Sequence, residues 1–394
     1  MFKHISAAVL TCLSLTAAAG QVAEINLTDS LGKEYYYVNV EVPDGNYRVT
    51  VDLGCKKFAG STTVRAESRR LFIENEQTRK GEKKSISFLV NKRTPEIPGK
   101  QPVRIKDRER GKLDWDQYLT LEITGERQAV TRVTIERDTV APTVFLCGNS
   151  TVVDQDDEPW ASWGQMITRW FADSLCFCNM AESGETASTF IQAGRLDKAL
   201  SMMKAGDYII IEFGHNDQKQ NFPGSGAYYN FATALKTYID ESRAREAEPI
   251  LITPTQRRTF DKEGRIQESH GDYPEAMRWV AEREGCRLVD LHEMTRELFE
   301  TMGVDGTKRA FVHYPANTFP GQETALADNT HFNPYGAYEI AKCVVTGLLE
   351  EGVPFTKYLR PEFPKDFSPL RPDDADAFVW VESHTTDLLK PDGN

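Results

Sequence analysis

Three short polar segments contain the residue types that nucleophilic hydrolysis requires. Ser150 lies in the segment GNST, Asn216 in GHND, and Asp328 and His331 in DNTH. A carboxylate three residues before an imidazole can hold one ring nitrogen, which leaves the other to take a proton from a serine hydroxyl. An asparagine amide can donate a hydrogen bond to the oxyanion that forms on an attacked carbonyl. The set predicts Ser150 as a nucleophile with His331 as its base.

Each segment also has a structural interpretation. A serine after a strand often caps a helix, neighbouring Asn and Asp residues favour turns, and a DxxH spacing arises often by chance. The positions of the segments favour chemistry. GNST and GHND directly follow apolar strand patterns at 144–148 and 208–213, and DNTH precedes a closing helical pattern. Sites in open parallel sheets form beyond the carboxyl ends of the strands.

The elements that must position these residues alternate between strand and helix from residue 143 to residue 351. Strands are predicted at 144–148, 176–181, 208–213, 249–253 and 288–291, and helices at 162–171, 186–203, 228–245, 273–284 and 333–351. Strands that alternate with helices predict a parallel sheet covered on both faces, which is a three-layer α/β/α domain.

The chain before this region has a different pattern. Short strand patterns separated by turn residues occur at 36–42, 46–53, 62–66, 70–74, 85–90, 118–123 and 130–135. They predict an all-β sandwich or jelly roll, with the charged, proline-containing segment 92–116 as an exposed loop. We therefore divide the chain into a signal peptide (1–20), an N-terminal β-sandwich (21–140), a catalytic domain (141–352) and a C-terminal extension (353–394).

The first twenty residues have the pattern of an export signal. A polar start at Lys3 and His4 is followed by an apolar stretch over 5–18 and by small residues before Gln21. The pattern predicts a signal peptide and a periplasmic or extracellular location, with a buried N-terminal helix as the alternative. The six cysteines after it are sparse and mostly in apolar surroundings, so we expect most of them to be buried free thiols.

Composition narrows the classes of partner. The chain has 59 acidic and 47 basic residues and a net charge of −12, which argues against nucleic acid. No stretch after the first twenty residues is apolar for long enough to cross a bilayer. The seven histidines form no HExxH or similar cluster, so we predict no metal and no cofactor. An acidic substrate would require a local basic patch.

Together the segments resemble the GDSL/SGNH hydrolases, and more narrowly the rhamnogalacturonan acetylesterases and their bacterial relatives. The similar stretch is about 143–351 and includes GNSTV, NMAESGET, FGHND and DNTHFNPYGA. The resemblance implies a flavodoxin-like α/β/α fold and a serine esterase that removes acetyl groups from a plant cell-wall polysaccharide, pectin above all. It implies that Ser150 is the nucleophile, that His331 is the general base and then the general acid, and that Asp328 orients His331.

The resemblance also implies an oxyanion hole made by the backbone N–H groups of Ser150 and Gly184 and the side chain of Asn216. A glycine at 184 makes physical sense, because it lets the main chain approach a ligand closely. One position departs from the family, which usually has Asp where Asn149 stands. Asparagine keeps a hydrogen-bonding oxygen and tolerates tight turns, so we keep the assignment.

Two pairs of residues are predicted to bind substrate. Trp160 and Trp163 follow the nucleophile and could pack against sugar rings, with core packing as the alternative. Arg257 and Arg258 follow the strand pattern at 249–253 and could grip a uronate carboxylate, with structural bonds as the alternative.

Other functional classes remain open at this point. The chain could be a glycan-binding protein whose hydrolase fold has lost activity, and Asn149 is the main support for this. It could also be an esterase that acts on xylan or on lipid esters. The N-terminal β domain resembles galactose-binding-like sandwiches, which would bind glycan or wall the active site. An acetylated polysaccharide or oligosaccharide is the expected partner, and the sequence does not indicate an oligomeric state.

Overall fold

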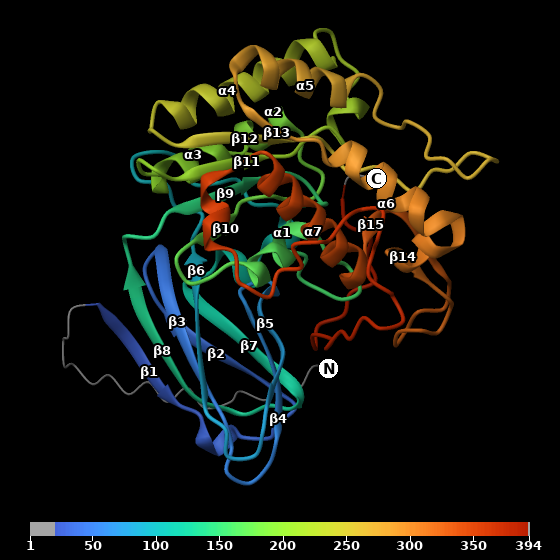
Figure 1. Ribbon diagram of the computed structural model, residues 1–394. Helices are drawn as coiled ribbons and strands as arrows, with labels where there is room; N and C mark the ends of the chain where they lie inside the picture. Colours follow the sequence, from blue (N-terminus) through green and yellow to red (C-terminus); the bar gives the residue numbers. More distant parts are fainter. Residues whose placement is uncertain (1–19, 393–394) are drawn as a thin grey trace.

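The computed structural model describes residues 20–392, and Figure 1 shows a β-rich part in blue and teal beside an α/β part. Residues 1–19 of the predicted signal peptide lie outside the described residues. The strands are β1 (Gln21–Asn26), β2 (Tyr35–Glu41), β3 (Gly45–Leu53), β4 (Gly60–Ala66), β5 (Arg70–Thr78), β6 (Lys84–Lys92), β7 (Tyr118–Arg127), β8 (Val130–Asp138), β9 (Thr143–Cys147), β10 (Cys176–Asn179), β11 (Tyr208–Ile211), β12 (Glu248–Ile252), β13 (Arg287–Val289), β14 (Phe311–Tyr314) and β15 (Leu326–Phe332).

Nine strands form one mixed sheet in the order β1-β8-β3-β6-β10-β9-β11-β12-β13. Strands β10, β9, β11, β12 and β13 pair in parallel, and in chain order they read 2-1-3-4-5, the order of flavodoxin-like folds. The sheet continues into the N-terminal part because β6 pairs with β10 at Val90 and Phe177. The strand patterns did not predict this continuity.

The N-terminal part is a sandwich of two sheets. The antiparallel end of the mixed sheet faces a four-stranded sheet of order β2-β7-β4-β5. Inward side chains from both sheets, such as Val51 and Val133 on one and Val64 and Leu121 on the other, form one apolar core. This arrangement agrees with the predicted sandwich.

Helices cover both faces of the parallel strands. They are α1 (Trp163–Met166), α2 (Ala187–Gln192), α3 (Arg195–Met202), α4 (Ala232–Arg243), α5 (Tyr273–Glu284), α6 (Leu291–Gly306) and α7 (Pro334–Glu350). Alternate residues of β9 show the division: Val144 and Leu146 pack with α1, α6 and α7, whereas Phe145 and Cys147 pack with α2 to α5. Figure 1 shows α4 and α5 on one side of the sheet and α1 and α7 on the other.

Several elements differ from the prediction. The helix predicted over 186–203 is two helices, because Gly194 adopts a φ of 79° between them. Helix α6 and the hairpin β14–β15 were not predicted, and Asp328 and His331 lie in β15. The segment 92–116 is not an exposed loop, because Arg93 and Trp115 are buried and stack on each other.

Buried arginines of the sandwich reach into the α/β part. Arg70 Nε lies 2.9 Å from Asp154 Oδ2, and Arg69 Nη1 donates to the Trp160 carbonyl at 2.8 Å. Asp154 and Trp160 belong to the loop that follows β9, so the N-terminal sandwich supports the loop after the first parallel strand.

The last described residues cross the α/β part with little regular structure. Trp380 Nε1 donates to Glu158 Oε1 at 2.9 Å, and Phe378 packs on Tyr335 of α7. Within residues 20–392, no helix is both long enough and apolar enough to cross a membrane. The six cysteines of this part are unpaired and five of them are buried, which confirms the expectation of buried free thiols.

Candidate active site

Ser150 lies on a tight turn directly after β9. The turn requires glycine at 148, because a Cβ there would lie 2.5 Å from Val152 Cγ2 and 3.1 Å from the Glu212 carbonyl oxygen. The Ser150 carbonyl accepts hydrogen bonds from Gln155 Nε2 at 3.0 Å and from Ser162 Oγ at 2.6 Å. These bonds fix the backbone that carries the Ser150 hydroxyl.

Asn149 forms the other half of this turn. Its Oδ1 accepts from the Thr151 backbone N–H at 3.0 Å, and Thr151 Oγ1 lies 3.0 Å from the same oxygen. A side-chain oxygen that accepts from the N–H two residues later is the bond by which Asx residues stabilise turns. Asparagine supplies this oxygen as aspartate would, so the departure from the family pattern leaves the turn intact.

Ser150, His331 and Asp328 form a continuous hydrogen-bonded row. His331 Nε2 lies 2.9 Å from Ser150 Oγ, and His331 Nδ1 lies 2.9 Å from Asp328 Oδ2. Asp328 Oδ1 accepts from the backbone N–H groups of Thr330 at 2.7 Å and His331 at 2.9 Å. Burial alone would raise the pKa of Asp328, but the hydrogen bonds from His331 and from the backbone hold that pKa well below its usual range. Asp328 is therefore ionised and accepts only.

The residues predicted for the oxyanion hole lie on two neighbouring loops. Asn216 follows β11, and its Nδ2 donates one hydrogen bond to the Glu185 carbonyl at 3.0 Å, which leaves its second N–H. Gly184 adopts a φ of 79°, a conformation that favours glycine. Among residues 20–392, no protein acceptor takes the backbone N–H of Ser150 or of Gly184.

Asp217 joins these two loops. Its carboxylate accepts from the backbone N–H of Ala187 at 2.8 Å and of Gly214 at 2.9 Å. Burial raises the pKa of this carboxyl to about 7. The bonds set the distance between the loop that carries Asn216 and the loop that carries Gly184.

The two predicted tryptophans have different surroundings. Trp163 is fully buried in the core, and its Nε1 donates to the buried carboxylate of Glu212. The prediction that Trp163 contacts sugar is therefore wrong, because its ring has no exposed face. Trp160 is also buried, with 4% of its surface exposed, but it lies beside the row with its ring edge-on to His331 at a centroid distance of 5.8 Å.

The two predicted arginines bond mainly to the protein. Arg257 donates to the carbonyls of Ser269 and His215, each at 2.9 Å. Arg258 donates to Thr307 Oγ1 and Asn329 Oδ1, each at 3.1 Å. The structure thus favours the structural alternative for this pair, although Arg257 brings its charge to the loop that carries Asn216.

The last described residues cover the row. Lys390 Nζ lies 3.3 Å from Asp328 Oδ2, and Trp160 Nε1 donates to the Asp387 carbonyl at 2.9 Å. Asp392 lies against Gly184, since its Cβ is 3.0 Å from the position that a Cβ on Gly184 would take. Ser150 is consequently only 3% exposed.

Sequence reasoning missed two cations at this site. Lys219 Nζ donates to Asn216 Oδ1 at 3.3 Å. Burial, and then the charges of Arg257 and Lys390, lower the pKa of Lys219 to about 8. Three positive groups, Lys219, Arg257 and Lys390, therefore contact the loop that carries Asn216 or the Asp328 carboxylate, on an acidic chain. Lys219 follows GHND by two residues, so its position in the sequence could have indicated that it lies near Asn216. No sequence pattern connects Lys390 with the active site.

Comparison with known proteins agrees with this geometry. The model of the GDSL-like lipase/acylhydrolase family matches residues 146–337. Rhamnogalacturonan acetylesterase RhgT of Bacillus subtilis (strain 168) is 38% identical over 218 residues, which are 55% of this chain and 93% of RhgT. The chain belongs to the GDSL-like lipase/acylhydrolase family. The matched segment contains Ser150, Asn216, Asp328 and His331.

Two further relatives extend the comparison. The probable rhamnogalacturonan acetylesterase YesY of the same strain is 30% identical over 54% of this chain and 95% of its own length. The X-ray structure of YxiM from Bacillus subtilis has a TM-score of 0.50 at 24% identity and covers 81% of both chains. An alignment over 81% of this chain is longer than the family segment, so the fold shared with YxiM extends beyond residues 146–337.

Proposed function

We propose that this protein is a carbohydrate acetylesterase that uses Ser150 as its nucleophile. The observation that carries the proposal is the row Ser150–His331–Asp328, which has hydrogen-bond contacts at both links. Ser150 Oγ attacks the acetyl carbonyl while its proton passes to His331 Nε2, and Asp328 stabilises the imidazolium. The sugar hydroxyl leaves with the proton from His331. Water then attacks the acetyl-enzyme by the same route and releases acetate.

The negative charge that forms on the acetyl oxygen has three candidate donors. They are the backbone N–H groups of Ser150 and Gly184 and the second N–H of Asn216. Donors that are fixed before the reaction stabilise the transition state without reorganisation. The bonds of Asp217 to both loops supply this rigidity. The mechanism uses only side chains and backbone of this chain.

The substrate that we favour is acetylated pectin of the rhamnogalacturonan type. Two relatives carry rhamnogalacturonan acetylesterase in their names. Pectin contains uronates, and Lys219, Arg257 and Lys390 gather positive charge around Asn216 and Asp328 although the chain has a net charge of −12. Local charges act on a bound carboxylate, whereas salt screens the rest of the protein beyond roughly 8 Å.

Acetate release from a panel of substrates tests the proposal. We expect release from acetylated rhamnogalacturonan and from a small activated acetyl ester. Ser150→Ala should remove nearly all of it, by roughly a million-fold, because loss of a nucleophile disables the whole unit. Equal turnover by Ser150→Ala would refute the assignment of the nucleophile. A preference for acetylated xylan or for lipid esters would change the proposed substrate class but not the proposed mechanism.

The second candidate is a glycan-binding protein without activity, which the departure at Asn149 favours. Wild-type protein that binds acetylated pectin but releases no acetate would support it. Against this candidate stands Asn149 Oδ1, which accepts from Thr151 as a turn at the nucleophile needs.

Lys219 offers a sharper test of the uronate. Lys219→Gln should lower kcat/KM for acetylated galacturonan-type substrates by about 10- to 150-fold, because hydrogen bonds to charged groups contribute about 1.5–3 kcal/mol. The small neutral ester should change much less, because it has no carboxylate. Lys236→Gln is a matched control, since Lys236 is half exposed and pairs with Asp240 on α4. Equal losses on both substrates would assign Lys219 to the support of Asn216 instead.

Two further expectations join this proposal. We propose that the protein is exported, on the pattern of residues 1–20, and a mature chain that begins at Gln21 in mass spectrometry would support this. We also propose that the sandwich of residues 21–138, with its resemblance to galactose-binding-like domains, serves as a wall of the active site. Arg69 supports this, because it donates to the carbonyl of Trp160 beside His331.

A further inference from the structure

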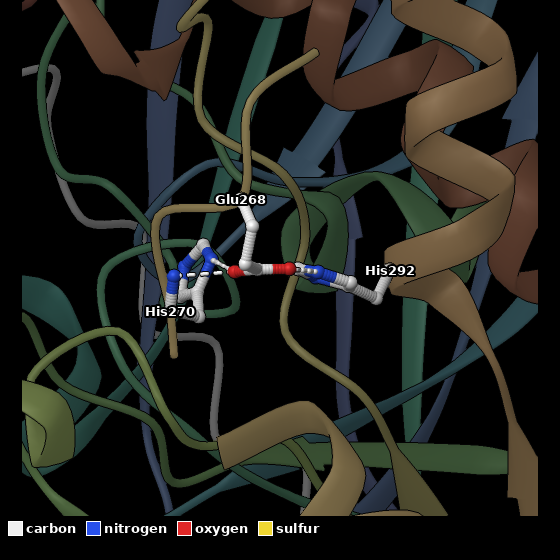
Figure 2. Close-up of side chains that lie close together, drawn as sticks. All are labelled: Glu268, His270 and His292. Carbon is white, nitrogen blue, oxygen red and sulfur yellow. Dashed lines mark hydrogen bonds and ion pairs between the residues drawn. The ribbon is translucent and has the colours of Figure 1, made fainter. Parts of the chain in front are cut away.

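A second cluster of polar side chains lies outside the catalytic row. Glu268 and His270 come from the long connection between β12 and α5, and His292 comes from the first turn of α6. Figure 2 shows the Glu268 carboxylate between the two imidazole rings, with one oxygen directed toward each. Glu268 Oε2 is 2.7 Å from His292 Nε2, and Glu268 Oε1 is 3.7 Å from His270 Nδ1. One ligand atom from each of the three residues lies within 4.8 Å of the others.

The contacts of His292 identify which of its nitrogens carries a proton. Its Nδ1 lies 2.8 Å from the Pro254 carbonyl oxygen, which can only accept. Its Nε2 lies 2.8 Å from Gln256 Nε2, an amide nitrogen that can only donate. The Pro254 contact places a proton on Nδ1. The amide orientation of Gln256 in the structure gives Nε2 a lone pair, and it leaves Gln256 Oε1 buried without a hydrogen-bond partner among residues 20–392. The 2.7 Å contact with Glu268 Oε2 then joins two acceptors, an arrangement that a cation between them would stabilise.

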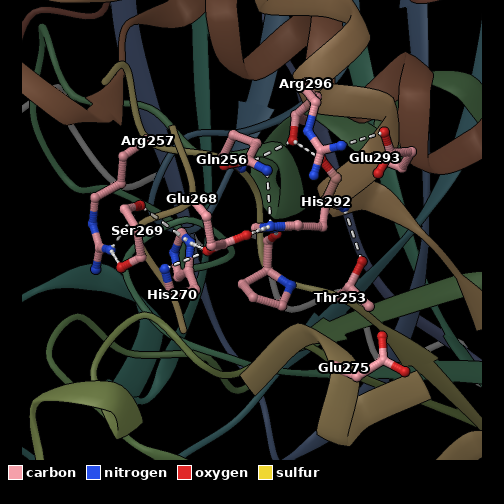
Figure 3. Close-up of polar contacts among 12 residues, drawn as sticks. Thr253, Gln256, Arg257, Glu268, Ser269, His270, Glu275, His292, Glu293 and Arg296 are labelled. Carbon is pink, nitrogen blue, oxygen red and sulfur yellow. Dashed lines mark hydrogen bonds and ion pairs between the residues drawn. The ribbon is translucent and has the colours of Figure 1, made fainter. Parts of the chain in front are cut away.

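His270 has a matching support on its far side. Its Nε2 lies 3.0 Å from His215 Nδ1, and His215 Nε2 lies 3.1 Å from Thr255 Oγ1. When these hydrogen bonds run from His270 to Thr255, each ring donates at Nε2 and His270 Nδ1 keeps a lone pair. That nitrogen lies 3.3 Å from Ser269 Oγ and 3.7 Å from Glu268 Oε1. Metal-binding histidines commonly donate their other N–H to a carbonyl or another acceptor in this way. Figure 3 shows other polar contacts around the cluster, among them those of Gln256 with His292 and of Arg257 with Ser269.

From this geometry we propose that Glu268, His270 and His292 bind one divalent cation of the zinc class. Two imidazole nitrogens and one carboxylate oxygen are a known ligand set for tetrahedral zinc. Ligands at about 2.1 Å from a tetrahedral ion lie roughly 3.4 Å apart. The contacts of 2.7 and 3.7 Å involve different oxygens of Glu268, and one ligand atom from each residue lies within 4.8 Å of the others, so modest side-chain shifts would bring the three to that spacing. The two histidines are buried while the Glu268 side chain is 45% exposed, so an ion can enter from the carboxylate side.

The position of the cluster indicates a structural role for the ion. It would tie the connection between β12 and α5 to α6. His215 directly precedes Asn216, and Arg257 joins the carbonyls of His215 and Ser269. The ion would therefore stabilise the back of the loop that carries Asn216. This proposal concerns binding and stability, and it stands independently of the esterase proposal.

The test uses the whole chain without a histidine tag, stripped with a chelator and dialysed. Zinc chloride is titrated in by calorimetry, and thermal unfolding is followed with and without zinc. We expect saturable binding of one ion per chain at micromolar concentrations or below and a higher Tm with zinc. Magnesium should give neither effect, because it prefers six oxygen ligands.

Variants locate the site. Glu268→Gln and His270→Ala should each weaken zinc binding at least 10- to 100-fold and abolish the zinc-dependent rise in Tm. Glu293→Gln is the matched control, because Glu293 lies on the same first turn of α6 and pairs with Arg296. Circular dichroism of Glu268→Gln shows whether it folds, and the visible spectrum of cobalt bound in place of zinc reports the ligands independently of stability.

Two results would overturn the proposal. Absence of saturable zinc binding by the wild type would mean that a proton on His292, with the Gln256 amide reversed, holds the cluster together. Unchanged binding by both ligand variants would place the ion elsewhere. Loss of ester hydrolysis in Ser150→Ala, with zinc binding intact, keeps this proposal separate from that of the esterase.

Discussion

Replacement of Asp328 by asparagine isolates the role of the carboxylate without changing its shape. Asp328 Oδ1 accepts from two backbone N–H groups, so in the Asp328→Asn variant the amide oxygen must take that position. The amide nitrogen then takes the position of Oδ2, 2.9 Å from His331 Nδ1. An amide N–H₂ can only donate, so the neutral imidazole must accept at Nδ1 and carry its proton on Nε2. That proton points at Ser150 Oγ, and the base is lost.

The magnitude follows from this change of tautomer. The same substitution in a serine–histidine–aspartate triad with intact geometry lowers kcat by about 10⁴, which corresponds to roughly 5.4 kcal/mol of transition-state stabilisation. KM should change little, because the amide keeps the backbone hydrogen bonds and the shape of the site. The assay is steady-state hydrolysis of a small activated acetyl ester, with kcat and KM measured separately.

A second background makes the prediction sharper. In Ser150→Ala protein, Asp328→Asn should cause almost no further loss, because residues that act as one unit are strongly non-additive. A single Asp328→Asn variant within tenfold of the wild type would refute the row as the catalytic unit. A double variant whose loss of kcat equals the product of the losses in Ser150→Ala and Asp328→Asn would also refute it.

Three further perturbations test other parts of the site. Asn216→Ala should lower kcat by about 100- to 1000-fold with a smaller change in KM, which steady-state kinetics would measure, because it removes one oxyanion donor. Ending the chain after residue 385 removes the cover on Trp160, so kcat/KM for the small neutral ester should rise, and an unchanged value would contradict a covering role. A uronate-containing polymer should gain less, because Lys390 is lost as well. Burial raises the pKa of Glu212 to about 7. The folded protein therefore keeps this proton at pH values where the unfolded chain has lost it, and the stability gained at low pH is lost as pH rises through about 7. The contribution of this group should therefore lower the free energy of unfolding by at most about 1.4 kcal/mol per pH unit. Urea titrations at several pH values should show that the free energy of unfolding of Glu212→Gln depends less on pH between 5 and 8 than that of the wild type.

The fold was predictable wherever apolar periodicity and turn residues agree. The five parallel strands, helix α5 and helix α7 follow the predicted order because buried strands and amphipathic helices leave strong patterns. The broken helix at Gly194 and the continuity of the sheet through Val90 and Phe177 were not predictable. The first depends on one residue's φ, and the second on pairing between segments about ninety residues apart.

The catalytic residues were predictable because each lies at a strand end in a short segment. The substrate-binding residues were not, because their role depends on which groups surround each side chain in the fold, and sequence does not reveal those neighbours. Trp160 and Trp163 are three residues apart, yet one lies beside His331 and the other donates to a buried carboxylate. The histidines of the second cluster were missed for the same reason: His270 and His292 meet only because β13 and the start of α6 bring them together.

The N-terminal sandwich and the nucleophile are linked by one short chain of hydrogen bonds. Arg69 donates to the carbonyls of Gln155 and Trp160, and Gln155 Nε2 in turn donates to the Ser150 carbonyl. Replacement of Arg70 by a neutral residue would leave Asp154 buried without this partner. Breaking such a buried pair costs about 3–5 kcal/mol, a large part of the roughly 5–15 kcal/mol that typically holds a domain folded. The sandwich is thus part of the support of the catalytic turn, whether or not it also binds glycan.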